Sequence, residues 1–259
     1  MPTLLISLKE IEEQIARLEI HYLASAQGDL YFALLSDWRD APSEHVDSDE
    51  ELQAAAQKGI ARLNQRYGPA PAGERFLLLH RRRVWNEGES RWIGWERKRG
   101  KLCELNRLLR GANDTTFVAP PALPADVRYV VTLDADTRLP RDTVGQLIGK
   151  MAHPLNRPRL DVGLGRVVEG YGILQPRVTP ALPVGREGSL FLRVFSSAIG
   201  IDPYAAAVSD VYQDLFGEGS YTGKGIYDVD AFEPALHGRV PDSTLLSHDL
   251  FEGIFARAG

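Results

Sequence analysis

The chain has 259 residues and a formal net charge of −5, with 44% hydrophobic and 25% charged residues. These proportions are typical of a globular protein and argue against a disordered, collagen-like or repetitive chain. The acidic balance disfavours general nucleic-acid binding, which needs a basic surface. A single cysteine, Cys103, excludes an internal disulfide framework and a multi-cysteine zinc site. No apolar run approaches the roughly 18 residues of a membrane span.

Strands and helices alternate along the predicted chain. The apolar start at residues 3–6 predicts a strand, and apolar residues at helical spacing predict a helix over 8–24. The next elements are a strand at 31–37, a helix ending at Tyr67 before Gly68, a strand at 75–80, a helix from about Lys101 to Arg110, a proline-rich loop over 111–124 and a strand at 127–133.

This alternation predicts an α/β fold with a mostly parallel central sheet and helices on both faces. Ligands of such sheets bind beyond the carboxyl ends of the strands, so the loops after Leu35, His80 and Leu133 are where we expect the chemistry. The helical pattern still continues at the end of the chain. We therefore treat residues 1–259 as a single domain that is a fragment of a longer protein.

Two carboxylates, Asp134 and Asp136, directly follow the central strand in VVTLDADT. Alternation along an extended segment would place both on the same side, where they could share one divalent cation. The alternative is an Asx turn that leads into a helix near Pro140. The pattern by itself leaves both readings open.

Two enzyme classes place Asp-x-Asp after an apolar strand. Haloacid-dehalogenase-like phosphatases use the first aspartate, here Asp134, as the nucleophile. GT-A glycosyltransferases use the pair, here Asp134 and Asp136, to hold Mg²⁺ or Mn²⁺ on the diphosphate of a nucleotide sugar. The phosphatase motif normally lies on the first strand, whereas about 130 residues and three predicted strands precede it here. Position therefore favours the glycosyltransferase.

Residues 75–110 are strongly basic, with eleven Lys or Arg against four Glu. This asymmetry predicts an anionic ligand. Gly100 and Lys101 open the predicted helix, where backbone N–H groups and the helix dipole favour phosphate. A solvated helix with i,i+4 ion pairs is the alternative, and a partner or nucleic-acid surface with the nearby tryptophans is a third, less favoured reading.

A further group of polar residues, His248, Asp249 and Glu252, lies at a predicted helix start within LLSHDLFEG. Ser247 could simply cap that helix, with the two acidic residues complementing its dipole. The functional alternative is that Asp249 is the general base of an inverting glycosyl transfer, which must accept the proton of the acceptor hydroxyl.

Long strings over most of the chain, from about Pro2 to Gly253, resemble the glycosyltransferase domain of cyclic β-1,2-glucan synthase. They include LYFALLSDWRDAP, GWERKRGKLCELNRLLRG, VVTLDADTRLPRDT, GRVVEGYGILQPRV and GEGSYTGKGIYDVDAF. The resemblance implies a GT-A fold, UDP-glucose as donor, a divalent metal and inversion to a β-1,2 linkage. It also implies a large parent protein at the cytoplasmic face of the bacterial inner membrane.

More distantly, the order of motifs is similar to that of processive glycosyltransferases such as cellulose synthase. This resemblance implies that Asp37 contacts the uracil and that Asp249 is the base, although Ser-His-Asp stands here for Thr-Glu-Asp. The family's downstream Gln/Arg-x-x-Arg-Trp motif is not found before Gly259, which puts polymerising activity of the fragment in question. The residues implied at the diphosphate and glucose are Gly100, Lys101 and Asn106.

Together with these residues, the resemblance implies an inverting β-1,2-glucosyltransferase that uses UDP-glucose and Mg²⁺ or Mn²⁺, with a glucan acceptor and no nucleic acid. Asp134 and Asp136 would bind the metal, Lys101 would stabilise the leaving UDP, and Asp249 would deprotonate the acceptor's 2-hydroxyl. Residues 223–225 would shape the acceptor side. The alternatives are the phosphatase acting through Asp134 and a non-catalytic nucleotide-sugar-binding module.

Overall fold

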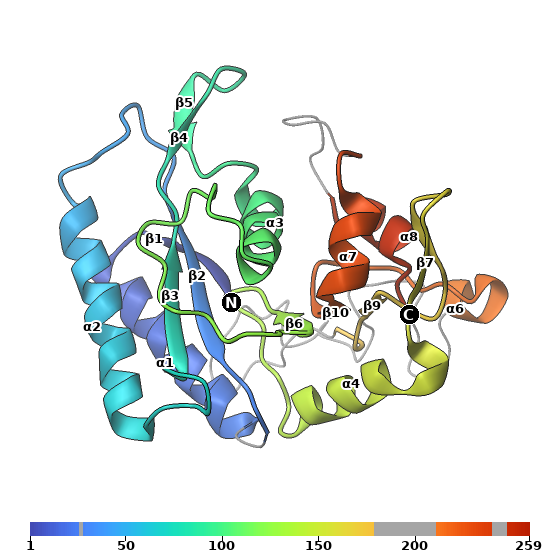
Figure 1. The fold of residues 1–259 in the computed structure, drawn as a ribbon. Helices are drawn as coiled ribbons and strands as arrows, with labels where there is room; N and C mark the ends of the chain where they lie inside the picture. The colour runs from blue at the N-terminus through green and yellow to red at the C-terminus, as the bar shows by residue number, and fades with distance from the viewer. Residues whose placement is uncertain (26–27, 179–210, 240–247) are drawn as a thin grey trace, which may run out of the picture.

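The computed structural model describes residues 1–25, 28–178, 211–239 and 248–259. It is an α/β structure with two three-stranded sheets, and helices pack on both of them (Figure 1). Two short antiparallel hairpins accompany the sheets. They are formed by β4 (Val84–Asn86) with β5 (Arg91–Ile93) and by β7 (Arg159–Asp161) with β8 (Arg166–Glu169).

The first sheet is parallel, has the strand order β1-β2-β3, and carries helices on both faces. Successive side chains of a strand point to opposite faces. Leu34 of β2 therefore packs in the core formed with α1 and α2, whereas its neighbour Leu35 packs against α3. This half has the predicted α/β arrangement. Its elements are β1 (Pro2–Leu5), α1 (Leu8–Ala24), β2 (Phe32–Trp38), α2 (Asp49–Tyr67), β3 (Phe76–His80) and α3 (Arg97–Leu109).

The second sheet is antiparallel and has the order β6-β10-β9. Ile226 of β10 packs against α4 on one face, whereas Tyr227 packs with α7 and α8 on the other. The elements of this half besides the β7–β8 hairpin are β6 (Tyr129–Thr132), α4 (Thr143–Ala152), the 3₁₀ helix η1 (Pro154–Asn156), β9 (Ile173–Leu174), α6 (Val211–Phe216), β10 (Gly225–Asp228), α7 (Val229–Leu236) and α8 (Asp249–Ala256).

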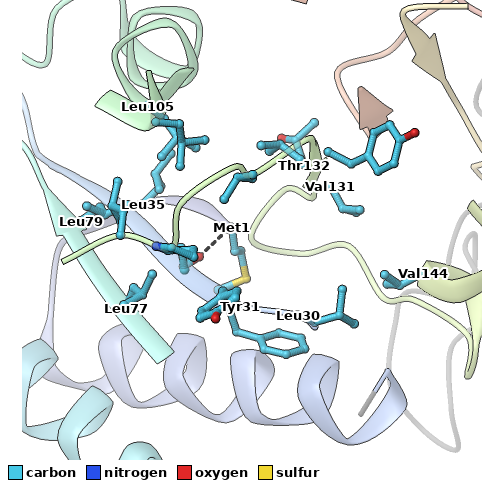
Figure 2. Close-up of a pocket in the computed structure, with 18 of the residues that line it drawn as sticks. Met1, Leu30, Tyr31, Leu35, Leu77, Leu79, Leu105, Val131, Thr132 and Val144 are labelled. Carbon is cyan, nitrogen blue, oxygen red and sulfur yellow. Dashed lines mark hydrogen bonds between the residues drawn. The ribbon is translucent and has the colours of Figure 1, made fainter. Parts of the chain in front are cut away.

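The prediction of one mostly parallel central sheet is wrong for the strand at 127–133. In the described part of the chain, β6 lies at a sheet edge and pairs antiparallel with β10, from Gly225 opposite Thr132 to Asp228 opposite Tyr129. A mostly apolar pocket of about 560 Å³ lies between β6 and the first sheet (Figure 2). Its lining includes Leu35 and Val131, and no ladder of hydrogen bonds joins the described strands across it.

Helix α3 begins four residues earlier than predicted, at Arg97 instead of Lys101. Glu96 and Arg97 both have positive φ angles, 48° and 49°, which turn the chain sharply into the helix. The sequence around them contains no capping pattern that would mark this start. Among the described residues, no helix is both long enough and apolar enough to cross a bilayer.

Candidate functional site

Asp134 lies just beyond the end of β6 and is held by two lysines. Lys98 Nζ is 2.6 Å from its Oδ1, and Lys224 Nζ is 2.6 Å from its Oδ2. Burial would raise the pKa of Asp134, but the hydrogen bonds from Lys224 and Lys98 outweigh burial and hold that pKa below its ordinary value. Asp134 is therefore an ionised carboxylate with two cationic neighbours.

Asp136 does not continue an extended segment, so the alternation argument for a shared side is wrong. The chain turns directly after Asp134, where Thr137 N–H donates to the Asp134 carbonyl at 3.0 Å. Asp136 lies in this turn and is exposed. The turn is closed by the backbone carbonyl of Asp134, whose side-chain oxygens bind lysines, so it is not the predicted Asx turn, and α4 begins at Thr143 and not near Pro140. Metal binding by the pair stays a prediction.

Gly223 is the point at which Asp249 and Lys98 approach each other. It has a φ of +76°, and its carbonyl accepts a hydrogen bond from Lys98 Nζ at 2.9 Å. A Cβ at this position would lie 2.6 Å from Asp249 Oδ1 and 2.7 Å from Lys98 Nζ. Only glycine leaves room for both groups. The fold thus brings Asp249 close to the lysine that holds Asp134, although the two aspartates are far apart in the sequence.

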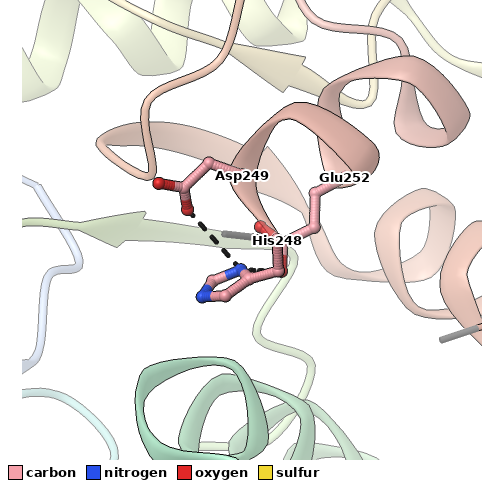
Figure 3. A group of neighbouring side chains, drawn as sticks. All are labelled: His248, Asp249 and Glu252. Atoms are coloured by element: carbon pink, nitrogen blue, oxygen red, sulfur yellow. Dashed lines mark hydrogen bonds and ion pairs between the residues drawn. The ribbon is translucent and has the colours of Figure 1, made fainter. Parts of the chain in front are cut away.

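Asp249 is the first residue of α8 and belongs to a compact polar group with His248 and Glu252 (Figure 3). His248 Nδ1 lies 2.8 Å from Glu252 Oε1 and 3.5 Å from Asp249 Oδ1. The Glu252 side chain is 3% exposed. Asp249 Oδ1 is buried and accepts no hydrogen bond within the part of the chain that the structure describes. The alternative cap, Ser247, lies outside the described residues.

Asp37 and Lys101, both implied at the donor, belong to a buried ionic network. Arg81 binds Asp37 through Nε at 2.7 Å and Nη2 at 3.0 Å, and its Nη1 binds Glu104 at 2.8 Å. Lys101 Nζ lies 3.0 Å from Asp37 Oδ2 and donates to the Thr3 carbonyl at 2.7 Å. These charges compensate one another inside the first half. Their contacts with a nucleotide stay predictions.

Gly100 and Asn106 are likewise engaged in interior contacts. Because α3 starts at Arg97, the Gly100 N–H donates to the Glu96 carbonyl at 3.0 Å. The prediction that it opens the helix and offers this N–H to phosphate is wrong. Asn106 is fully buried, and its Oδ1 accepts a hydrogen bond from the Tyr227 hydroxyl at 2.8 Å. Asn106 therefore joins α3 to the second sheet.

The excess positive charge of residues 75–110 is largely balanced by carboxylates from other segments. The charge asymmetry therefore does not by itself indicate an anionic ligand. The carboxylates that pair with these basic side chains are distant in the sequence but adjacent in the structure. The pairs with acids outside the segment are Arg81–Asp37, Arg83–Asp49, Arg97–Asp40, Lys98–Asp134, Lys101–Asp37, Arg107–Asp114 and Arg110–Asp230.

Lys98 is the site residue that sequence reasoning missed. Lys101 was predicted at the site because it follows Gly100. In the structure, Lys101 points into the interior, whereas Lys98 reaches Asp134 and Gly223. A helix start at Arg97 would have placed Lys98 in the exposed first turn. Residues 223–224, predicted on the acceptor side, do lie at this site, whereas Gly225 begins β10, where a Cβ would lie 2.5 Å from the Leu174 carbonyl oxygen.

These observations define an α/β protein in which Asp134, just beyond a strand, binds a lysine of α3, and Asp249 of α8 approaches the same lysine at Gly223. No protein-family model matches the chain. The chain is 53% identical over 258 residues to cyclic beta-(1,2)-glucan synthase NdvB of Rhizobium meliloti (strain 1021). The match covers 99% of this chain but only 9% of that protein. The resemblance to cyclic β-1,2-glucan synthase is confirmed, and the chain corresponds to one segment of such a synthase.

Proposed function

We propose that this chain is the glucosyltransferase segment of a β-1,2-glucan synthase, with a GT-A-type fold and UDP-glucose as donor. The similarity to the Rhizobium meliloti synthase supports the class of reaction. The observation that carries the proposal is the convergence of Asp134, Lys98 and Asp249 around Gly223. An inverting transfer needs positive charge at the leaving diphosphate and a carboxylate on the acceptor side.

On the donor side, Asp134 and Asp136 would hold Mg²⁺ or Mn²⁺. Carboxylate oxygens are the ligands that these cations prefer, and Asp136 is exposed beside the ionised Asp134. When bound there, the cation would neutralise charge on the departing UDP. Lys98 and Lys224 supply further positive charge at the same carboxylate, and in this proposal they take the role that was predicted for Lys101.

On the acceptor side, Asp249 would act as the general base. Its Oδ1 is buried and accepts no hydrogen bond within the described residues, but the side chain as a whole is 28% exposed, so the carboxylate can be reached by an acceptor hydroxyl. The acceptor's 2-hydroxyl oxygen attacks the anomeric carbon, the bond from that carbon to UDP breaks, and the hydroxyl proton passes to Asp249. Attack from the face opposite UDP inverts the anomeric centre.

Calorimetric titration of this chain with UDP, with and without Mn²⁺, tests the donor site. We expect Mn²⁺-dependent binding that is lost in Asp136→Ala. A phosphatase acting through Asp134 has less support, because the chain is 53% identical over 258 residues to a glucan synthase. Indifference to UDP together with a beryllofluoride adduct would support the phosphatase and overturn the proposal.

Asp249→Asn in the full-length synthase tests the base. We expect UDP-glucose binding without glucan extension, because asparagine cannot accept the proton. Normal extension by this variant would show that Asp249 is not the base. Binding of UDP-glucose by the unsubstituted full-length protein without any turnover would instead support a non-catalytic nucleotide-sugar-binding module.

A further inference from the structure

We propose that His248 and Glu252 form a pair that positions the carboxylate of Asp249. The inference rests on the proposed role of Asp249 as base and adds how the protein holds that carboxylate. It also gives a function to the histidine that stands where related motifs have glutamate.

The hydrogen bond between His248 and Glu252 joins the imidazole Nδ1 to Glu252 Oε1 at 2.8 Å. In this proposal the imidazole Nδ1 carries the proton and donates it to the carboxylate oxygen. The two residues are four positions apart at the start of α8, which places them on one side of the helix. Because the Glu252 side chain is 3% exposed, little water competes for this bond.

The same imidazole lies against Asp249. His248 Nδ1 is 3.5 Å from Asp249 Oδ1, and the ligand atoms of all three residues lie within 4.8 Å of one another. Two carboxylates this close repel each other, most strongly where burial reduces screening. The protonated nitrogen between them offsets that repulsion and keeps Asp249 from rotating away.

Groups from separate elements also lie next to the Asp249 carboxylate. The backbone of Gly223 lies directly against its Oδ1, with Lys98 next to it. His248 and Gly223 therefore both lie close to Asp249 Oδ1, and Lys98 lies close to Gly223. The titratable groups around Asp249 are His248 and Glu252 of α8, Lys98 of α3 and Tyr221 before β10. Asp134 and Lys224 are linked to this group through the ion pairs of Asp134 with Lys98 and Lys224.

A loosened Asp249 would still leave the donor side intact. Asp134, Lys98 and Lys224 do not depend on His248 for their contacts. We therefore expect His248→Gln and Glu252→Gln in the full-length synthase to lower kcat on the order of 100-fold, as misplacement of a reacting group does. The KM for UDP-glucose should stay within about twofold of the wild-type value. Asp230→Asn, which removes an exposed carboxylate on α7, is the matched control and should keep the wild-type kcat.

A second measurement separates positioning from a general loss of structure. Glu252→Gln removes a negative charge near Asp249, so the acidic limb of the pH–rate profile should move to lower pH. His248→Gln removes the group that offsets repulsion, so the same limb should move to higher pH. Opposite movements are not expected from a merely structural role.

A third measurement needs no activity. In this chain, nitrogen-15 spectra of the imidazole should report a protonated Nδ1 for His248 and a changed tautomer equilibrium in Glu252→Gln. Wild-type kcat in both variants, with Asp249→Asn inactive, would overturn the positioning role and leave the base in place. An active Asp249→Asn would overturn both. Identical pH limbs in the two variants, or loss of Mn²⁺ binding in both, would also overturn the positioning role.

Discussion

Arg81 holds the carboxylate of Asp37 through two nitrogens, Nε at 2.7 Å and Nη2 at 3.0 Å, and both side chains are buried. Parallel bonds of this kind are charge-assisted and geometrically specific. The pair lies where β2 and β3 end, at the edge of the sheet where ligands of α/β proteins commonly bind. In this protein, the charged side chains of Asp37 and Arg81 occupy that edge.

Asp37→Asn should strongly destabilise the protein. The substitution leaves Arg81 and Lys101 without the carboxylate that compensates them, and breaking a buried ion pair costs on the order of 3–5 kcal/mol. Asp40→Asn is the control, since Asp40 pairs with the exposed Arg97 and should cost less than about 1 kcal/mol. Urea denaturation of the two variants measures the difference. Equal losses would mean that the buried network does not stabilise the fold.

Gly223→Ala should cost more stability than Gly111→Ala. Both glycines have positive φ, +76° and +88°, so each alanine incurs backbone strain of about 1–2 kcal/mol. Only at Gly223 would the new Cβ also meet Asp249 and Lys98, whereas Gly111 has nothing within 4 Å. Denaturation midpoints of the two variants separate the steric cost from the backbone cost. If Gly111→Ala were the more damaging, the close approach at Gly223 would be refuted.

Tyr227→Phe should destabilise by about 1–3 kcal/mol, because it leaves the buried Asn106 Oδ1 without its donor. Tyr67→Phe removes a hydroxyl that donates to Glu19 near the surface and should cost clearly less. Thermal or chemical unfolding gives both values. A large effect of Asn106→Ala on UDP affinity with unchanged stability would instead support the donor role that the resemblance implies.

The stability of the protein should fall as the pH decreases from about 6.5 towards 4. Burial, followed by the positive charges of the Met1 amino group and Arg17, lowers the pKa of His21 from 6.5 to about 4. Between these values the unfolded chain binds a proton that the folded chain does not, so acidification favours unfolding. The pKa of His80 shifts in the same direction, because burial lowers it to about 4.

Replacing His21 with leucine tests this account. Both ring nitrogens of His21 are buried without a partner in the described residues, so leucine can fill the site without leaving a polar group unsatisfied. Between pH 7 and pH 4.5, the free energy of unfolding should fall by on the order of 1–3 kcal/mol less in His21→Leu than in the wild-type protein. Comparing each protein with itself at the two pH values removes the effect of altered packing. An unchanged pH dependence would contradict the prediction.

The first half of the fold was predictable because its signals are local. Apolar residues at helical spacing gave α1 its bounds of Leu8–Ala24, and Gly68 marks the end of α2 as expected. The start of α3 was missed because it depends on positive φ angles at Glu96 and Arg97, which have no sequence signature.

The second sheet and the composition of the site depend on long-range pairing. No local pattern indicates that β6 pairs antiparallel with β10, or that Lys224 thereby reaches Asp134. The sequence predicts roles for Asp134 and Asp249, and the fold brings both carboxylates near Lys98. Which lysine faces them could be read only after the helix start was known.

Helix α3 contacts both halves of the molecule. Lys101 reaches β1, Asn106 reaches β10, and Lys98 reaches the turn after β6. Separation of either sheet from this helix would break some of these contacts. Backbone amides in the middle of α3 should therefore exchange with deuterated water at a rate set by whichever half of the molecule opens more readily. Hydrogen exchange in this helix would then report the stability of the less stable half.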